Sequence, residues 1–349
     1  MVGKAWGSAA KTASGSGTAK KPVDEFFVQN HDVSLCLLVH RRTKTMRVVD
    51  FRAGPSSAKQ KFVMQFAAKE GVEKVYTLVE RDEVSTWAKM GFAKEANIPG
   101  FYKRSDAFML GSPVVTTNVR SEPPPAPKTS HMRISLRRGV SLPPLPIELA
   151  PEEEDDDDDA PVQVDTKAHD FAEKTLVHAK KRAKDLAGQS LPVAKLAQVK
   201  EADTKKQLAA ALKSGRAMTA FEPFGRDVER RYFVATARAG FELVASIESQ
   251  ACFGNAFLEL LTAPKNDAEA LATTSAVKVV CEKLLKEGTV SVFSLVPSDD
   301  VALASAFCFN GFRRTGLLLN HVVLGDGTGN GPRKDAIIFS KKLANPTAD

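Results

Sequence analysis

The sequence predicts an α/β protein built from two similar units, each a mixed, mostly antiparallel sheet with flanking helices. Residues 75–111 follow the order strand, short helix, glycine turn, strand and strand. The same irregular order returns at 291–343, which indicates a repeated structural unit. The 349 residues leave room for two domains and a linker. Two unrelated α/β units that share this order by coincidence are the alternative.

The elements of the first repeat follow from residue type. VYTLV at 75–79 is β-branched and apolar, as strands commonly are, and Asp82 is suited to cap the next helix. Gly91 is expected to end that helix, because glycine tolerates the left-handed backbone of a helix C-terminus. A turn at 98–100 then precedes the closing strand.

Upstream of this repeat, two apolar segments at 33–40 and 46–51 are expected to form a hairpin. Ser56 or Ser57 is then expected to cap a helix that runs to about Glu70. Apolar residues recur along that helix at helical spacing, which predicts one buried face.

The second unit is expected within residues 165–344. Ala, Lys, Leu and Glu dominate the segments 165–188 and 193–215, and this composition predicts two helices. A strand hairpin at 231–247, a strand at 257–261 and a long helix follow before the second repeat.

Residues 1–24 and 113–164 have the composition of disordered segments. The first is a basic tail without the apolar core of a secretory signal. The second combines proline-rich stretches with the acidic run EEEDDDDD, and it cannot bury enough apolar area to offset the entropy of ordering. We interpret the acidic run as a solvated spacer, with a tail that mimics nucleic acid as the alternative. The folded units are therefore expected at 25–112 and 165–344.

The charge of the chain limits the kinds of partner that it can be expected to bind. The formal net charge of +7 lies largely in the tail and linkers, so nucleic acid is not the favoured partner. The basic patch KKRAK lacks interleaved aromatic residues, and we interpret it as a solvated helix face. No run of 18 apolar residues is present to span a membrane.

The four cysteines form no C-x-x-C pair, which predicts buried free thiols in a cytoplasmic protein and no metal site; a disulfide or a zinc site is the alternative.

The segment GFAKEANIPGFYKRSDAFMLG, at 91–111, resembles the ending of those GNAT-superfamily N-acyltransferases that acetylate lysine-like amines. In both repeats the order of elements is similar to that in the C-terminal half of a protein of this superfamily. The resemblance implies two degenerate GNAT-like copies in tandem, the first of them truncated because only the tail precedes 33–40. It also implies a V-shaped gap in the sheet, which we expect between 75–79 and 101–110. The activity it implies is transfer of an acetyl group from acetyl-CoA to an amine.

The resemblance further implies where acetyl-CoA would bind. In the family, a loop of the type R/Q-x-x-G-x-G/A presents backbone N–H groups to the CoA pyrophosphate at a helix N-terminus. The first copy has a degenerate form of this loop, in which Pro55 removes one donor. The candidate cofactor-binding residues are Arg52, Gly54, Ser56, Ser57 and Lys59. A serine-capped helix that binds no ligand is the alternative.

The corresponding loop of the second copy lacks both glycines and places Asp267 and Glu269 at the start of a helix. These carboxylates suit the helix dipole but would repel a pyrophosphate. We therefore expect that the second copy does not bind CoA in the manner of the family.

The groups for proton transfer depart from the family pattern. Where the family carries the tyrosine that protonates the leaving thiolate, this sequence has Trp87 and Phe307. Tyr102 is the substitute candidate for that acid, with a structural aromatic role as the alternative. Glu259 matches a strand position where the family often carries its base, with a solvent-facing carboxylate as the alternative. Two functions thus stay open: an acetyl-CoA-dependent N-acyltransferase that works from the first copy on an amine, or a catalytically inactive tandem protein that binds a ligand or a protein partner.

Overall fold

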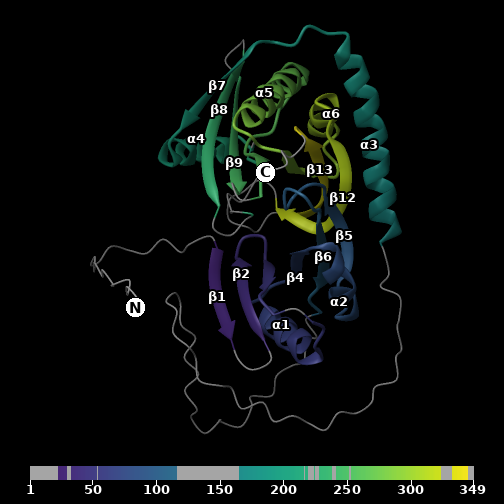
Figure 1. Cartoon of the computed structure of the whole chain (residues 1–349). Coiled ribbons are helices and arrows are strands. Elements are labelled where there is room, and N and C mark those ends of the chain that lie inside the picture. Colours follow the sequence, from purple (N-terminus) through teal and green to yellow (C-terminus); the bar gives the residue numbers. More distant parts are fainter. Residues whose placement is uncertain are drawn as a thin grey trace, which may run out of the picture.

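One sheet of 13 strands runs through the computed structural model of the chain (Figure 1). The structure describes residues 23–29, 33–52, 54–115, 165–215, 217–218, 224, 228–237, 241–250, 253–323 and 332–344. The expectations for most of the tail, for most of the linker and for the acidic run lie outside these residues.

The chain folds into two halves. The elements of the first half are β1 (Val23–Gln29), β2 (Ser34–His40), β3 (Thr45–Asp50), α1 (Ser57–Lys69), β4 (Lys74–Val79), α2 (Val84–Lys89), β5 (Ala93–Ile98) and β6 (Ala107–Pro113). The elements of the second half are α3 (Thr166–Ala187), β7 (Ala194–Val199), α4 (Glu201–Lys213), β8 (Glu229–Ala237), β9 (Glu242–Gln250), β10 (Asn255–Leu260), α5 (Asp267–Lys286), β11 (Ser291–Pro297), α6 (Val301–Phe309), β12 (Arg313–Val323) and β13 (Arg333–Lys342).

The strands of the two halves lie in matching order. The first half runs β1-β2-β3-β4-β6-β5, and the second runs β8-β9-β10-β11-β13-β12 with β7 added beside β8. In each half one pair of neighbours is parallel, β3 with β4 and β10 with β11. A helix, α1 or α5, connects the strands of each parallel pair, since parallel strands need a crossover. The halves join where β5 pairs with β12, at Ala96 and Gly316.

In each half, helices cover one face of the sheet. Parts of the two opposite faces pack against each other. In the first half α1 and α2 form a core with the sheet, and in the second half α3, α5 and α6 do so. Helix α4 packs on the opposite face of β8 and β9. A further core lies between the halves, where Tyr76, Phe101 and Met109 meet Phe257 and Ile338. Burial of these aromatic and aliphatic side chains holds the halves together.

Side-chain caps fix the starts of the helices that follow β3 and β10. The Ser56 hydroxyl accepts a hydrogen bond from the backbone N–H of Lys59 at α1, and Asn266 accepts one from Glu269 at α5. Ser56 was one of the two cap positions that the sequence predicted for α1. Asp82 does not cap α2, because it lies in the 3-10 turn that precedes that helix.

Two segments differ from the sequence prediction. Residues 194–199, expected within a helix, form β7, because pairing with β8 uses their backbone groups and Leu196 packs on the core of the second half. Val23 and Asp24, expected in the tail, begin β1, whose Phe26 is buried with its ring centroid 5.1 Å from that of Phe66. The first half therefore has a strand before its hairpin where only a tail was predicted.

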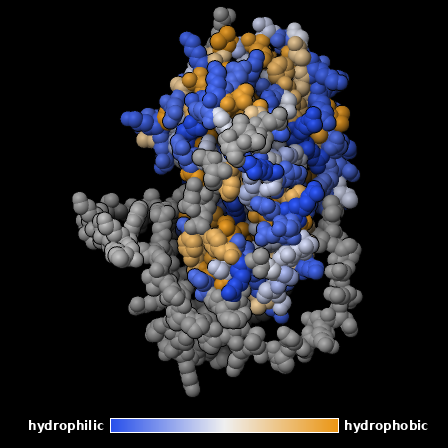
Figure 2. Space-filling model, in the orientation of Figure 1, coloured by the Kyte–Doolittle hydropathy of each residue, from blue (hydrophilic) through white to orange (hydrophobic). Residues whose placement is uncertain are grey.

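The surface and the thiols add three observations. In Figure 2 apolar residues gather over β1 and β2, where Phe27 is 46% exposed. None of the described helices combines the length and the apolar character needed to cross a membrane. Among the described residues, Cys36, Cys281 and Cys308 form no disulfide bond, and the first two are buried, as the sequence predicted for them.

Candidate functional site

Both parallel pairs of strands stop pairing before their C-terminal ends. β3 pairs with β4 from Thr45 to Val48 only, and β10 pairs with β11 from Asn255 to Phe257 only. We expected the gap between 75–79 and 101–110, but β4 and β6 pair along their whole length, so that expectation is wrong. The antiparallel strand β6 holds β4 throughout, whereas the parallel strands are connected only through a crossover helix and can separate.

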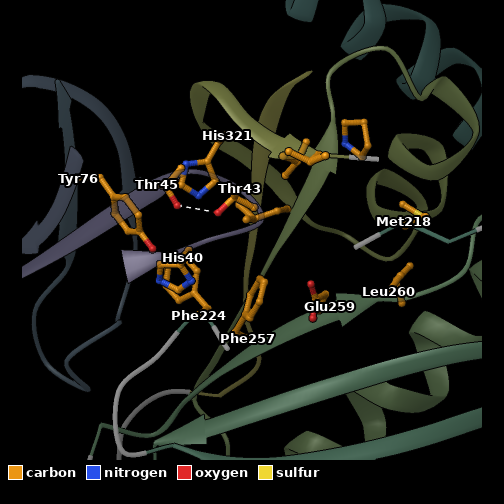
Figure 3. A pocket seen from close by; sticks show the side chains of 14 residues that line it. His40, Thr43, Thr45, Tyr76, Met218, Phe224, Phe257, Glu259, Leu260 and His321 are labelled. Carbon is orange, nitrogen blue, oxygen red and sulfur yellow. Dashed lines mark hydrogen bonds between the residues drawn. The ribbon is translucent and has the colours of Figure 1, made fainter. Parts of the chain in front are cut away.

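A cleft opens where β10 and β11 separate, and the first half closes one of its sides. It encloses about 680 Å³ of empty space, its open mouth included. In Figure 3, Tyr76, His40 and Thr45 lie on one side of the cleft, and Glu259 and Leu260 lie on the other. The described residues that line it are His40, Thr43, Thr45, Tyr76, Met218, Phe224, Phe257, Glu259, Leu260, Leu295, Pro297, His321, Val322 and Val323.

Glu259 lines this cleft, but its carboxylate is already engaged. Arg230 donates to it at 2.5 Å and the Ser246 hydroxyl lies 3.1 Å from it. The Nε of Arg230 also lies 3.5 Å from Glu248, whose carboxylate accepts the backbone N–H of Phe224. Burial alone would lower the pKa of Arg230, but the two carboxylates outweigh burial and raise it. Arg230 therefore stays charged and offsets one of the two negative charges at this wall of the cleft.

His321 is another titratable group in the cleft, and no pattern in the sequence pointed to it. Its side chain is 6% exposed, and its ring meets that of Tyr76 edge to face with the centroids 5.1 Å apart. Burial lowers the pKa of His321 well below its usual value, and the charges of Lys74, His40 and Arg333 lower it further. The imidazole is therefore neutral. Its Nδ1 atom has no hydrogen-bond partner among the residues that the structure describes.

The cations near His321 are paired with carboxylates at the junction of the halves. Lys74 donates to Glu95 at 2.6 Å and to the Leu319 carbonyl at 2.8 Å. Burial lowers the pKa of Lys74 and raises that of Glu95, while the pair itself opposes both shifts. Arg333 lies 3.0 Å from Glu73 and donates to the Thr43 carbonyl. These contacts tie β12 and β13 to the first half directly behind the cleft.

The candidate cofactor loop of the first half does not line this cleft. Lys59 is 2% exposed, and its ammonium donates to Asp50 at 2.6 Å and to the carbonyls of Arg52 and Gly54 at 2.8 and 3.0 Å. Its three N–H donors are thus used inside the loop, so Lys59 does not fit the predicted role of pyrophosphate ligand. Arg52 and Ser57 are exposed at the surface of the loop. Gly54 has a φ of 117°, which explains a glycine there.

In the second half, acidic side chains occupy the start of α5. Asn266 accepts the N–H of Glu269, and the Glu269 carboxylate accepts the N–H of Lys265 at 2.7 Å. This reciprocal arrangement is a capping box. Asp267 pairs with Arg182 of α3 at 2.5 Å. The N–H groups that the family would use for pyrophosphate are therefore partly taken by the chain itself.

The predicted acid also lies outside the cleft. Tyr102 sits in the turn between β5 and β6, with its hydroxyl 3.5 Å from the Leu78 carbonyl and its ring 5.2 Å from that of Phe253. Burial raises the pKa of Tyr102 to about 12. Trp87 and Phe307, which stand in the family's tyrosine position, are buried core residues. Of the predicted site residues, only Glu259 reaches the cleft.

Comparisons with known proteins concern the fold. No model of a known protein family matches the sequence, and no curated protein matches it. Solved structures similar to part of the chain are acetyltransferases. One from Sphaerobacter thermophilus, described as a putative acetyltransferase, is 18% identical over 44% of this chain and 96% of its own, with a TM-score of 0.34. The ribosomal-protein-S18-alanine N-acetyltransferase of Escherichia coli is 15% identical over 45% and 98%, with a TM-score of 0.33.

A third structure is spermidine N-acetyltransferase from Vibrio cholerae in complex with CoA and spermine. It is 12% identical over 44% of this chain and 96% of its own, with a TM-score of 0.34. Scores at this level carry no functional argument.

Proposed function

We propose that the chain is a tandem of two GNAT-like units that binds a small ligand in the cleft between its halves and does not transfer acetyl groups from acetyl-CoA. One observation carries this proposal: in both halves the helix start that would hold the pyrophosphate is engaged by the chain's own side chains. In the first half the Ser56 hydroxyl accepts the Lys59 N–H, and the Lys59 ammonium is used inside the loop. In the second half Asn266 and Glu269 form the capping box. An anion at such a helix start needs free N–H donors and an uncompensated positive field.

The matching strand order supports the tandem arrangement. Both halves place one parallel pair at the same point of the order and follow it with a short helix and two antiparallel strands. An irregular order of this kind is improbable for two unrelated sheets. We assign the units to the predicted ranges 25–112 and 165–344, with β1 extending the first unit to Val23.

The state of the proton-transfer groups supports a binding role over catalysis. A general acid must lie within hydrogen-bond reach of the leaving atom and release its proton near the working pH. Tyr102 lies outside the cleft, and burial raises its pKa to about 12. Glu259 is committed to Arg230. Neither of the two predicted proton-transfer residues therefore meets these requirements.

A specific observation keeps N-acyltransferase activity of the first half as the second candidate. The first turn of α1 carries no acidic side chain, so an anion could approach Arg52, Gly54, Ser56 and Ser57. The hydroxyl of Tyr102 lies beside the carbonyl of Leu78, which is beyond the part of β4 that pairs with β3. In this candidate, acetyl-CoA would enter that opening and an amine would accept the acetyl group.

A turnover assay separates the two candidates. The full chain is incubated with acetyl-CoA and either spermidine or lysine, and free CoA is quantified by chromatography. We expect no CoA release above that of a protein-free control. Release that Ser57→Asp abolishes and Ser57→Ala preserves would instead establish the acyltransferase, because only the aspartate adds a negative charge at the exposed start of α1.

A further inference from the structure

We propose that the cleft between the halves binds an uncharged aromatic ring with an amide-like polar edge, and that His321 receives this edge. The inference deepens the proposed binding role, because it names the class of ligand for the same cleft. It depends on three properties of the cleft: its aromatic wall, its small number of charged lining residues and the imidazole nitrogen of His321 that has no partner among the described residues.

Three aromatic side chains from both halves form a continuous wall. The ring of Phe224 lies 4.9 Å from that of Phe257 and 6.5 Å from that of Tyr76, measured between centroids. The other described lining residues are apolar and polar side chains in similar numbers, with Leu260 and Leu295 among the apolar ones. Ring faces next to aliphatic side chains suit a flat apolar ring, because such pairs gain from both burial and ring geometry.

Few charged side chains line the cleft. Glu259 is the only acidic residue among the described lining residues, and it is paired with Arg230. Behind His321, Lys74 is paired with Glu95 and Arg333 lies against Glu73. No Lys or Arg is among the described lining residues, so a charged ligand would lose its hydration without gaining a new ion pair there. An uncharged ligand avoids that loss.

The fold aims His321 into the cleft. The pairing of β12 with β13 shifts register between Leu318 and Val322, and Asn320 adopts a φ of 48°. Such irregularities re-aim side chains that a regular strand would place elsewhere. The result is a buried imidazole whose Nδ1 atom lacks a partner among the described residues, and an unsatisfied buried nitrogen is costly to keep.

An amide group can form a hydrogen bond with this imidazole in either tautomer. If Nδ1 is unprotonated, the amide N–H donates to it; if Nδ1 carries the proton, the amide oxygen accepts from it. The hydroxyls of Thr43 and Thr45, 2.8 Å apart, lie on the same side of the cleft and offer further polar contacts (Figure 3).

Three probes of nearly identical shape test the inference on the full chain at pH 7.5. Benzamide is neutral, benzamidine is cationic and benzoate is anionic, and their dissociation constants are measured by ligand-observed NMR titration. We expect benzamide to bind at least about tenfold more tightly than either charged probe. Equal or tighter binding of a charged probe, or no binding of benzamide at about 10 mM, would overturn the inference.

A matched pair of variants locates the binding. His321→Phe keeps the ring volume and removes the polar atoms, and we expect it to weaken benzamide binding about tenfold. His178→Phe, the same change on the exposed face of α3, should leave binding unchanged. Equal weakening by both variants would place the probe elsewhere. The comparison of the three probes needs only the unmodified chain, so it stands even if a variant does not fold, and its failure leaves the turnover result unaffected.

Discussion

Lys59 and His321 are both buried, and their partners determine what each of them does. Lys59 has a carboxylate and two carbonyls for its three donors, whereas the Nδ1 of His321 has no partner among the described residues. The sequence pointed to Lys59 as a ligand-binding residue because a lysine near a degenerate phosphate loop is a plausible anion ligand. It could not show that Asp50 lies beneath the same loop.

Removal of the Lys59 charge should destabilise the protein. Lys59→Met leaves the carboxylate of Asp50, whose side chain is 8% exposed, without its partner. We expect the free energy of unfolding to fall by about 3 kcal/mol, because breaking one side of a buried ion pair leaves a charge without compensation. Urea denaturation measures this change. The double variant Asp50→Asn/Lys59→Met should recover part of the loss, and a single-variant loss below about 0.5 kcal/mol would contradict the structural role.

His321 should make stability depend on pH on the acid side. Its pKa in the folded state lies well below the ordinary value of 6.5, mainly through burial. The stability from this group is therefore complete above pH 6.5 and is lost as pH falls, because the unfolded chain takes up the proton first. We expect one such group to cost about 1 kcal/mol between pH 6.5 and 5.5.

Urea denaturation at pH 7.5 and 5.5 measures this dependence, and His321→Phe should remove that part of it. His178→Phe is the control, since His178 is exposed. The same pH dependence in the chain with and without the His321 imidazole would contradict the neutral buried state of this residue.

The helices and strands of the repeats were readable from the sequence, since both repeats carry clear strand patterns, a short helix and a glycine turn. β7 was missed because the Ala and Lys content of 194–199 favours a helix locally, and pairing with β8 overrides that preference. β1 was missed because Asp24 and Glu25 obscure its apolar residues. The opening in the sheet was placed one strand away from its true position, because sequence order does not tell which neighbours pair fully.

The junction of β5 and β12 depends on a close approach of two backbones. A Cβ atom on Gly316 would lie 2.1 Å from the Cβ of Ala96 and 2.7 Å from the carbonyl oxygen of Glu95. Gly316→Val should therefore separate the strands, lower the unfolding midpoint and expose the junction to limited proteolysis.

Gly188→Ala is the control for this experiment. A Cβ atom there would meet nothing closer than 3.9 Å, and the glycine is exposed. If Gly316→Val kept the stability and the protease resistance of Gly188→Ala, the two halves would not need the close approach of β5 and β12 to stay joined.

At the scale of the whole molecule, the candidate site exists only because the halves face each other. Tyr76 and Phe257 are about half the chain apart in sequence, yet they line the same cleft. Glu259 could be singled out from the sequence, because it stands at a recognisable strand position. His40, Thr45 and His321 could not, since their shared location depends on the packing between the halves.

Titration calorimetry of acetyl-CoA into the full chain tests the central claim most directly. With both helix starts engaged by the chain's own side chains, we predict no heat beyond dilution up to about 1 mM acetyl-CoA, which corresponds to binding weaker than about −4 kcal/mol. Saturable binding in the micromolar range that Ser57→Asp weakens at least about tenfold, and Ser57→Ala leaves intact, would contradict the account.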